Sequence, residues 1–150
     1  MLSKLLDKAE ALADEKKFKP EVLVNARLAP DMLSLAGQIQ RLSDTAKGAA
    51  ARLTGTEAPS FPDDEVTLAD LRARIDKTTA YLASVPESAY AGAEERDVVL
   101  KTRQQEVHFT GKDYLLTYAI PNFYFHLTTA YAILRHNGVA VGKLDFLGRT

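Results

Sequence analysis

The sequence predicts an all-α protein, an antiparallel four-helix bundle with a small β-hairpin before its last helix. Two observations support this. Apolar residues recur three or four positions apart over four long segments, which is the spacing of a buried helix face. Two short β-like runs, residues 97–101 and 106–110, interrupt that pattern before the fourth segment. With 150 residues, the chain is expected to form a single domain, residues 1–150.

The first helix is expected to begin at Leu2 and to end in the charged residues 14–17. One face of this helix is apolar and consists of Leu2, Leu5, Leu6, Ala9, Leu12 and Ala13. Pro20 restarts the chain, and residues 21–28 are expected to form a short helical turn.

The second helix is expected to begin at Pro30, because proline suits the first turn of a helix. Asp31 would then lie at the positive end of the helix dipole. The apolar stripe continues to Leu53, and Gly55 is placed where a left-handed cap would end the helix. Gly37 and Gly48 each weaken a helix by about 1 kcal/mol relative to alanine, and close contact with another helix is one reason for their presence.

Residues 56–65 form a predicted loop, in which Asp63, Asp64 and Glu65 are expected to be solvated. Thr67 and Asp70 then have the spacing of a capping box that starts the third helix. This helix has a narrow apolar seam and should stop before Pro86. The seam consists of Leu68, Leu71, Ile75, Thr78 and Leu82.

The last helix is expected to open at Thr110, with Asp113 three residues later, and to end at Asn137 and Gly138. Pro121 lies inside it and should kink or interrupt it near residues 116–120. The tail, residues 139–150, is expected to fold back on the bundle.

Composition excludes several classes of function. The chain has 19 Lys and Arg against 20 Asp and Glu, so no basic excess favours binding to nucleic acid. It has no cysteine, which excludes disulfides, thiolate metal sites and a cysteine nucleophile. No apolar run reaches the roughly 18–20 residues of a membrane span, and the first residues lack a signal-peptide pattern. We therefore expect a cytoplasmic protein.

The predicted site lies on the inner stripe of the last helix, where Asn122 and His126 are one turn apart. Metal sites in bundles are built at such positions, but an amide is a weak ligand for Zn, Ni or Fe. Three interpretations stay open for His126. It is a buried histidine bonded to Asn122, Thr129 or a facing helix, a metal ligand, or a polar group that binds a small molecule. If His126 binds a metal, Asp31 or Gln38 would be its possible partners from a facing helix.

The other histidines are expected to have no catalytic role. His108 should face solvent from a strand, and His136 lies in the last turn of the helix, where a cation is favourable. No Gly-rich phosphate loop, Gly-x-Ser-x-Gly elbow or His-Glu-x-x-His motif is present. Residues 47–52 read as a helix with two charges rather than as a phosphate site.

The last helix also carries a dense group of aromatic residues: Tyr114, Tyr118, Phe123, Tyr124, Phe125 and Tyr131. They could line a small-molecule pocket, with Tyr118 near Asn122 and His126, or fill the core and a subunit interface. Because residues 123–125 are consecutive, they point around the helix and cannot all face one core. This favours a homodimer.

Several longer stretches resemble a bacterial and fungal family, the domain of unknown function nineteen-ninety-three. The stretches are Arg27–Met32, Asp44–Leu53, Phe109–Leu116, Pro121–His126, Thr128–Gly138 and Lys143–Gly148. The resemblance covers nearly the whole chain. It implies a DinB-like four-helix bundle, from a superfamily with many metalloenzymes and some thiol-dependent transferases or isomerases.

The usual metal triad of that superfamily is three histidines, one on the second helix and two, four residues apart, on the fourth. His126 resembles the last of these, but Asn122 stands in the preceding position and the second helix has no histidine. The resemblance therefore implies a degenerate metal site, with His126 as the ligand if a metal binds. It identifies no cofactor.

Three functions follow as hypotheses. The first is a DinB-like protein that binds a small molecule between its helices, around Asn122 and His126 with Tyr118 and Asp31 nearby. The second is a metal- or thiol-dependent transferase or isomerase that uses His126. The third is a non-catalytic dimeric interaction module. Whether the protein is an enzyme stays open.

Overall fold

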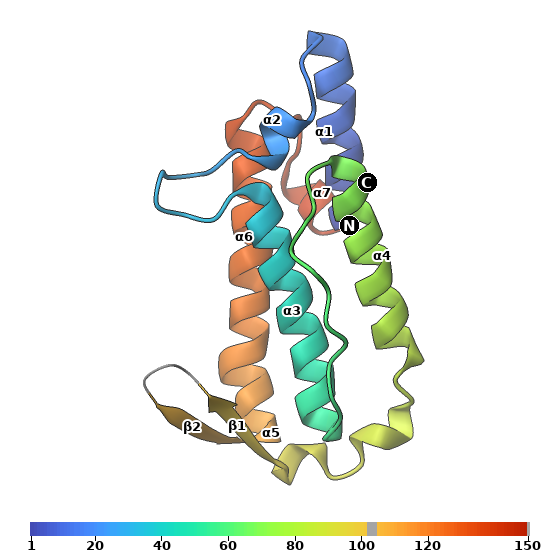
Figure 1. Cartoon of the computed structure of the whole chain (residues 1–150), viewed down its shortest axis with the longest axis vertical. Coiled ribbons are helices and arrows are strands. Elements are labelled where there is room, and N and C mark those ends of the chain that lie inside the picture. Colours follow the sequence, from blue (N-terminus) through green and yellow to red (C-terminus); the bar gives the residue numbers. More distant parts are fainter. Residues whose placement is uncertain (102–104, 150) are drawn as a thin grey trace.

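The computed structural model describes residues 1–101 and 105–149. Its four long helices form a bundle, with a two-stranded hairpin beside one end (Figure 1). The long helices are α1 (Leu2–Lys16), α3 (Leu35–Thr54), α4 (Leu68–Ser84) and α6 (Ile120–His136). The short elements are α2 (Glu21–Val24), β1 (Asp97–Lys101), β2 (Glu106–Thr110), α5 (Gly111–Asp113) and α7 (Lys143–Phe146). The predicted bundle and hairpin are confirmed.

The helices do not simply alternate in direction. In Figure 1, α1 and α6 run upward, whereas α3 and α4 both run downward. The two parallel helices are joined by residues 56–66, which we call the strap and which returns along the length of α3. A strap of this length reaches roughly 36 Å when extended, enough to span the roughly 30 Å of α3. This crossover brings the strap against both α3 and α4.

The main core lies between the long helices, where the apolar faces predicted from the sequence meet. Leu5, Ile39, Leu71 and Ile133, one from each long helix, are fully buried in it. A second, smaller cluster lies under the hairpin and consists of Leu53, Val98, Leu100, Tyr114 and Ala119. No helix among the described residues is long and apolar enough to cross a membrane.

The start of α3 differs from the prediction. This helix begins at Leu35, where the Ser34 hydroxyl accepts a hydrogen bond from the backbone N–H of Gly37. Asp31 lies outside the helix and is exposed, so its expected role at the helix dipole is wrong. The segment before Ser34 forms turns instead, because the backbone N–H of Leu35 donates to the carbonyl of Ala26 at 2.9 Å. The other end agrees with the prediction, since Gly55 is the left-handed cap with φ 72°.

Local signals set the starts of the other helices. Thr67 and Asp70 form the predicted capping box of α4. The Thr110 side chain accepts from the backbone N–H of Asp113 at 3.2 Å and caps α5, as predicted. The strands pair antiparallel from Asp97 opposite Thr110 to Lys101 opposite Glu106, and residues 102–104 between them lie outside the described residues. Next to the hairpin, α5 packs so closely that a Cβ at Gly111 would overlap the carbonyl oxygen of Ala93.

The predicted interruption of the last helix is a π-helical segment, Tyr114–Ala119, directly before Pro121. Here the backbone N–H of Ile120 donates to Leu115, five residues back, rather than four. Pro121 lacks the N–H that would continue the regular α-helical pattern, so the wider turn lies where a proline disturbs the preceding carbonyls. The helix then continues regularly to His136. In the tail, Val139 and Val141 are buried and the ring of Phe146 lies 5.7 Å from that of Tyr131.

Candidate functional site

A groove lies between α3 and the stretch from the π-helical segment into α6, with Leu100 of the hairpin at its edge. We call it the α3–α6 groove; its cavity volume is about 160 Å³. It is lined by Arg41, Asp44, Thr45, Arg52, Leu100, Tyr114, Tyr118, Asn122 and His126. Three residues predicted for the site, Tyr118, Asn122 and His126, therefore meet here. Asp31 is not among the lining residues.

The antiparallel packing of α3 on α6 gives the groove two distinct ends. Arg41 lies near His126, whereas Arg52 lies beside Tyr114. Between these ends, the Asn122 side-chain amide donates to the Thr45 hydroxyl at 2.7 Å. That bond joins the two helices and fixes the Asn122 side chain from the opposite wall.

His126 is held by a buried glutamine on α3. Its Nδ1 lies 2.8 Å from Oε1 of Gln38, which is 2% exposed. The Gln38 amide nitrogen donates to the carbonyl of Leu33 at 3.2 Å, and this orients Oε1 toward the histidine. Because a carbonyl oxygen can only accept, Nδ1 of His126 carries the proton and Nε2 keeps a free lone pair.

Burial lowers the pKa of His126, and the nearby positive charge of Arg41 lowers it further. The ring is therefore neutral at pH 7. It can accept a hydrogen bond at Nε2 or take a proton from a bound molecule. The sequence left Asn122, Thr129 or a facing helix as possible hydrogen-bond partners of His126, and the partner is Gln38 on the facing helix α3.

The opposite end of the groove is built from a cation and stacked aromatic rings. The Arg52 Nη1 donates to the Tyr114 hydroxyl at 3.2 Å, and its guanidinium lies 5.8 Å from the centre of that ring. The rings of Tyr114 and Tyr118 are stacked with centroids 5.8 Å apart. Burial raises the pKa of Tyr114, so its hydroxyl stays protonated. Tyr118 is 44% exposed and presents its ring at the edge of the groove.

The groove borders a group of ion pairs that we call the ion cluster. It has three cations and three anions, namely Arg41, Lys47, Arg74, Asp44, Asp63 and Glu65. The Arg74 guanidinium is at its centre and is almost fully buried; it lies 3.0 Å from Asp44, 3.0 Å from Asp63 and 2.8 Å from Glu65. The predicted solvated acidic loop is wrong for Glu65, whose side chain is 8% exposed against Arg74, whereas Asp63 and Asp64 are exposed as predicted.

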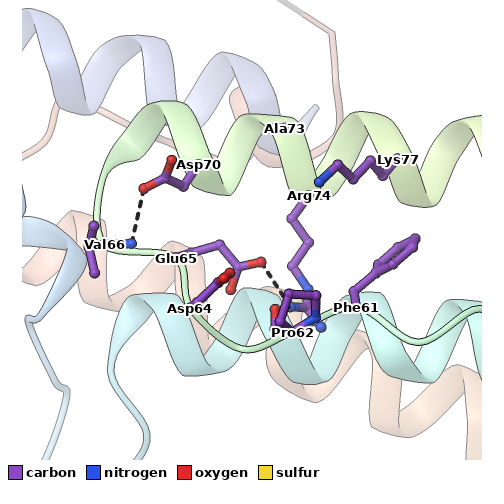
Figure 2. A pocket seen from close by; sticks show the side chains of 9 residues that line it. All are labelled: Phe61, Pro62, Asp64, Glu65, Val66, Asp70, Ala73, Arg74 and Lys77. Carbon is purple, nitrogen blue, oxygen red and sulfur yellow. Dashed lines mark hydrogen bonds and ion pairs between the residues drawn. The ribbon is translucent and has the colours of Figure 1, made fainter.

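Figure 2 shows how Arg74 reaches from α4 to the strap, with Glu65 and Pro62 around its end. Its Nη1 also donates to the carbonyl of Pro62 at 2.9 Å. Burial opposes the charge on both partners. The carboxylates nevertheless raise the pKa of Arg74, and hydrogen bonds from Arg74 and Gln40 lower that of Glu65. Arg74 and Glu65 are thus both ionised, and the cluster fastens the strap to α3 and α4.

The hollow drawn in Figure 2 has a volume of about 320 Å³ and lies between the strap and α4. Its polar groups serve the fold. Asp70 accepts from the backbone N–H groups of Val66 and Thr67, at 3.1 and 2.9 Å, and Glu65 is paired with Arg74. The carboxylates of Glu65 and Asp70 in this hollow are therefore already engaged by the fold.

The two remaining histidines lie where the sequence predicts. His108 is exposed on β2, with Nδ1 3.3 Å from Asp97 on the neighbouring strand. His136 is exposed in the last turn of α6. Neither lines the groove.

Sequence reasoning misses five residues that line the groove: Arg41, Asp44, Thr45, Arg52 and Leu100. A signal for Arg52 existed in Gly48, one turn before it, because a Cβ at Gly48 would overlap Nη1 of Arg52. The absence of a side chain at Gly48 lets Arg52 lie across the helix. The expectation that Gly37 and Gly48 contact another helix is wrong, since a Cβ at Gly37 would instead meet Leu33, 3.0 Å away in the preceding turn.

The groove is lined by one histidine, His126, and not by the three that are usual in the DinB-like superfamily. Across residues 1–101 and 105–149, no three His, Cys, Asp or Glu side chains are grouped to hold a metal. Nδ1 of His126 is engaged by Gln38, and Asn122 occupies the preceding turn. The donor set thus fits hydrogen bonding to an organic molecule and not metal coordination.

Comparisons with known proteins agree with this fold. The family model described as "Domain of unknown function (DUF1993)" matches residues 1–147. A crystal structure of a DinB family member protein from Shewanella denitrificans is 48% identical in sequence and superposes with a TM-score of 0.93. The alignment covers 99% of this chain and 84% of that chain. No curated protein matches the chain.

Proposed function

We propose that this chain, which belongs to the family of the domain of unknown function DUF1993, binds a small organic molecule in the α3–α6 groove. Its fold is that of a DinB family protein. The observation that carries the proposal is the convergence of Tyr118, Asn122 and His126 on one groove, where α3 fixes the last two by hydrogen bonds of 2.7 and 2.8 Å.

The groove offers complementary groups for a small molecule. The His126 ring accepts a hydrogen bond at Nε2, and Arg52 donates at the other end. Leu100 and the Tyr118 ring supply the apolar surface of the groove. Binding sites combine apolar walls with a few fixed polar groups in this way, because the former supply affinity and the latter orientation.

Metal-dependent catalysis receives no support from this donor set. A thiol-dependent reaction would need its sulfur from outside, because the chain has no cysteine. Non-catalytic binding is therefore the function that the described geometry favours, with His126 as a hydrogen-bonding residue.

The predicted homodimer and cytoplasmic location stay predictions. Of the three consecutive aromatics, Tyr124 is 53% exposed and Phe125 is 58% exposed. Their rings would be the contacts of a second subunit, since large exposed aromatic side chains are favoured at interfaces. Sedimentation of the wild type and of Phe125→Ser would decide between a dimer and a monomer.

The binding proposal is tested by screening a library of small organic fragments with protein-observed NMR spectroscopy. We expect hits that shift the resonances of Asn122 and His126. Tyr118→Ala should weaken these hits, whereas Tyr124→Ala should not, because Tyr124 is an exposed tyrosine of the same helix outside the groove. A library without groove hits, or equal binding by both variants, would overturn the proposal.

A further inference from the structure

The two arginines of the groove differ in how their charges are balanced. Arg41 belongs to the ion cluster, where it pairs with Asp63 and Asp44. The three cations of that cluster face three carboxylates, so its formal charges cancel. The end of the groove near His126 is therefore close to neutral.

Arg52 is different. In the part of the chain that the structure describes, it forms no ion pair, and its hydrogen-bond partner is the neutral hydroxyl of Tyr114. Its side chain is exposed, yet the contact with Tyr114 and the space above Gly48 place its guanidinium at the groove. This end of the groove thus carries one positive charge that no carboxylate of the described chain balances.

We infer that the ligand of the α3–α6 groove is a small monocarboxylate with an apolar body, whose carboxylate binds Arg52. This inference rests on the proposed function and names its ligand class. The planar guanidinium presents paired donors that match the two oxygens of a carboxylate. Tyr118 stacks on Tyr114, which contacts Arg52, so the exposed ring of Tyr118 lies close enough to bind the apolar body of the ligand.

The balance of charge favours a carboxylate over a phosphate ester. A carboxylate brings one negative charge, which equals the single unbalanced charge of Arg52. A phosphate monoester carries between about −1.5 and −2 at pH 7 and would need a second free cation. Arg41 is already paired with carboxylates and does not supply it.

The test uses three probes with the same ring: benzoate, its neutral analogue benzamide and the dianionic phenyl phosphate. Affinity is measured by NMR titration of the folded full-length chain, with the groove resonances as the readout. We expect benzoate to bind with roughly millimolar affinity and benzamide and phenyl phosphate roughly tenfold more weakly. Arg52→Gln should abolish the preference for benzoate, while Arg135→Gln, an exposed arginine of α6 outside the groove, should not change it.

Gly48→Ala gives a second test that leaves Arg52 in the chain. The added Cβ must displace the Arg52 guanidinium, so benzoate binding should weaken while the protein stays folded. Equal affinity for benzoate and benzamide would overturn the carboxylate inference but leave binding in the groove intact. Stronger binding of phenyl phosphate than of benzoate would overturn the carboxylate inference in favour of a phosphate ligand. If no probe binds, the inference is also overturned, while the fragment screen still tests whether the groove binds small molecules.

Discussion

Gln38 on α3 and His126 on α6 are joined by a hydrogen bond of 2.8 Å, although 88 positions separate them in the sequence. The bond links the two walls of the groove and fixes which histidine nitrogen carries the proton. It also satisfies a glutamine oxygen that is buried between the helices. The stability of the bundle and the chemistry of the groove therefore depend on the same pair of residues.

His126→Leu should destabilise the protein by about 1–3 kcal/mol, because it leaves Oε1 of the buried Gln38 without a donor. The double variant His126→Leu with Gln38→Leu removes both partners and should recover part of this loss. Urea unfolding of the wild type, both single variants and the double variant measures the coupling. A His126→Leu variant as stable as the wild type would show that the bond contributes nothing.

Stability should depend on pH through His126. Its pKa in the folded protein lies below its ordinary value of 6.5, so the unfolded chain takes up the proton first as pH falls. The stability that depends on neutral His126 is present above pH 6.5 and is lost progressively below it. Between about pH 7.5 and about pH 5.5, the free energy of unfolding should decrease more in the wild type than in His126→Gln. Equal decreases would contradict a lowered pKa.

Arg74→Met should cost about 3 kcal/mol, because it leaves the buried carboxylate of Glu65 without its cationic partner. Lys77→Met on the same helix is the control, since Lys77 is exposed and should tolerate the change. Chemical unfolding of both variants gives the comparison. Similar losses in the two would mean that the ion cluster is unimportant for stability.

Acid should loosen the strap. The pKa of Glu65 is lowered in the folded protein, below its ordinary value of 4.5. The stability that ionised Glu65 contributes is therefore complete above pH 4.5, and it is lost as the pH falls through the lower pKa of the folded protein. The protection factors of the strap amides, which correct for the slower intrinsic exchange in acid, should therefore fall in acid more than those of α3. In Glu65→Gln this dependence should flatten. An unchanged profile in that variant would assign the acid response to other carboxylates.

Two glycines should respond oppositely to alanine. Gly48→Ala adds a methyl group that meets only the mobile end of Arg52, so the higher helix propensity should raise stability by up to about 1 kcal/mol. Gly111→Ala places the methyl group on the backbone carbonyl of Ala93 and should destabilise strongly. Thermal unfolding distinguishes the two, and a stable Gly111→Ala would refute the close backbone contact.

The features that the sequence predicts well are local. The Thr67 and Asp70 box, the Thr110 cap and the interruption before Pro121 each depend on residues within about one turn. The sequence does not determine the start of α3, because both Pro30 and Ser34 suit a helix start and only tertiary contacts of the preceding turn distinguish them.

The groove itself depends on contacts that no local pattern encodes. Apolar periodicity marks the seam of α4 but cannot show that Arg74 is buried there, because its carboxylate partners come from the strap and from α3. Likewise, the helical spacing places Asn122 and His126 on the inner stripe. Their partners Thr45 and Gln38 depend on the position of α3 along the axis of α6, which no local pattern encodes.

The π-helical segment determines the direction in which the side chains on this side of the groove point. In a regular α-helix, residues four apart are rotated by about 40° from each other, so Tyr114, Tyr118, Asn122 and His126 would wind away from α3. The wider turn at Tyr114–Ala119 rotates the chain less per residue and offsets this drift, and all four side chains line the groove. A regular α-helix with the same number of residues would instead rotate the Tyr114 end by about 100° relative to His126. The wider turn is thus what keeps the cationic and imidazole ends facing the same cavity.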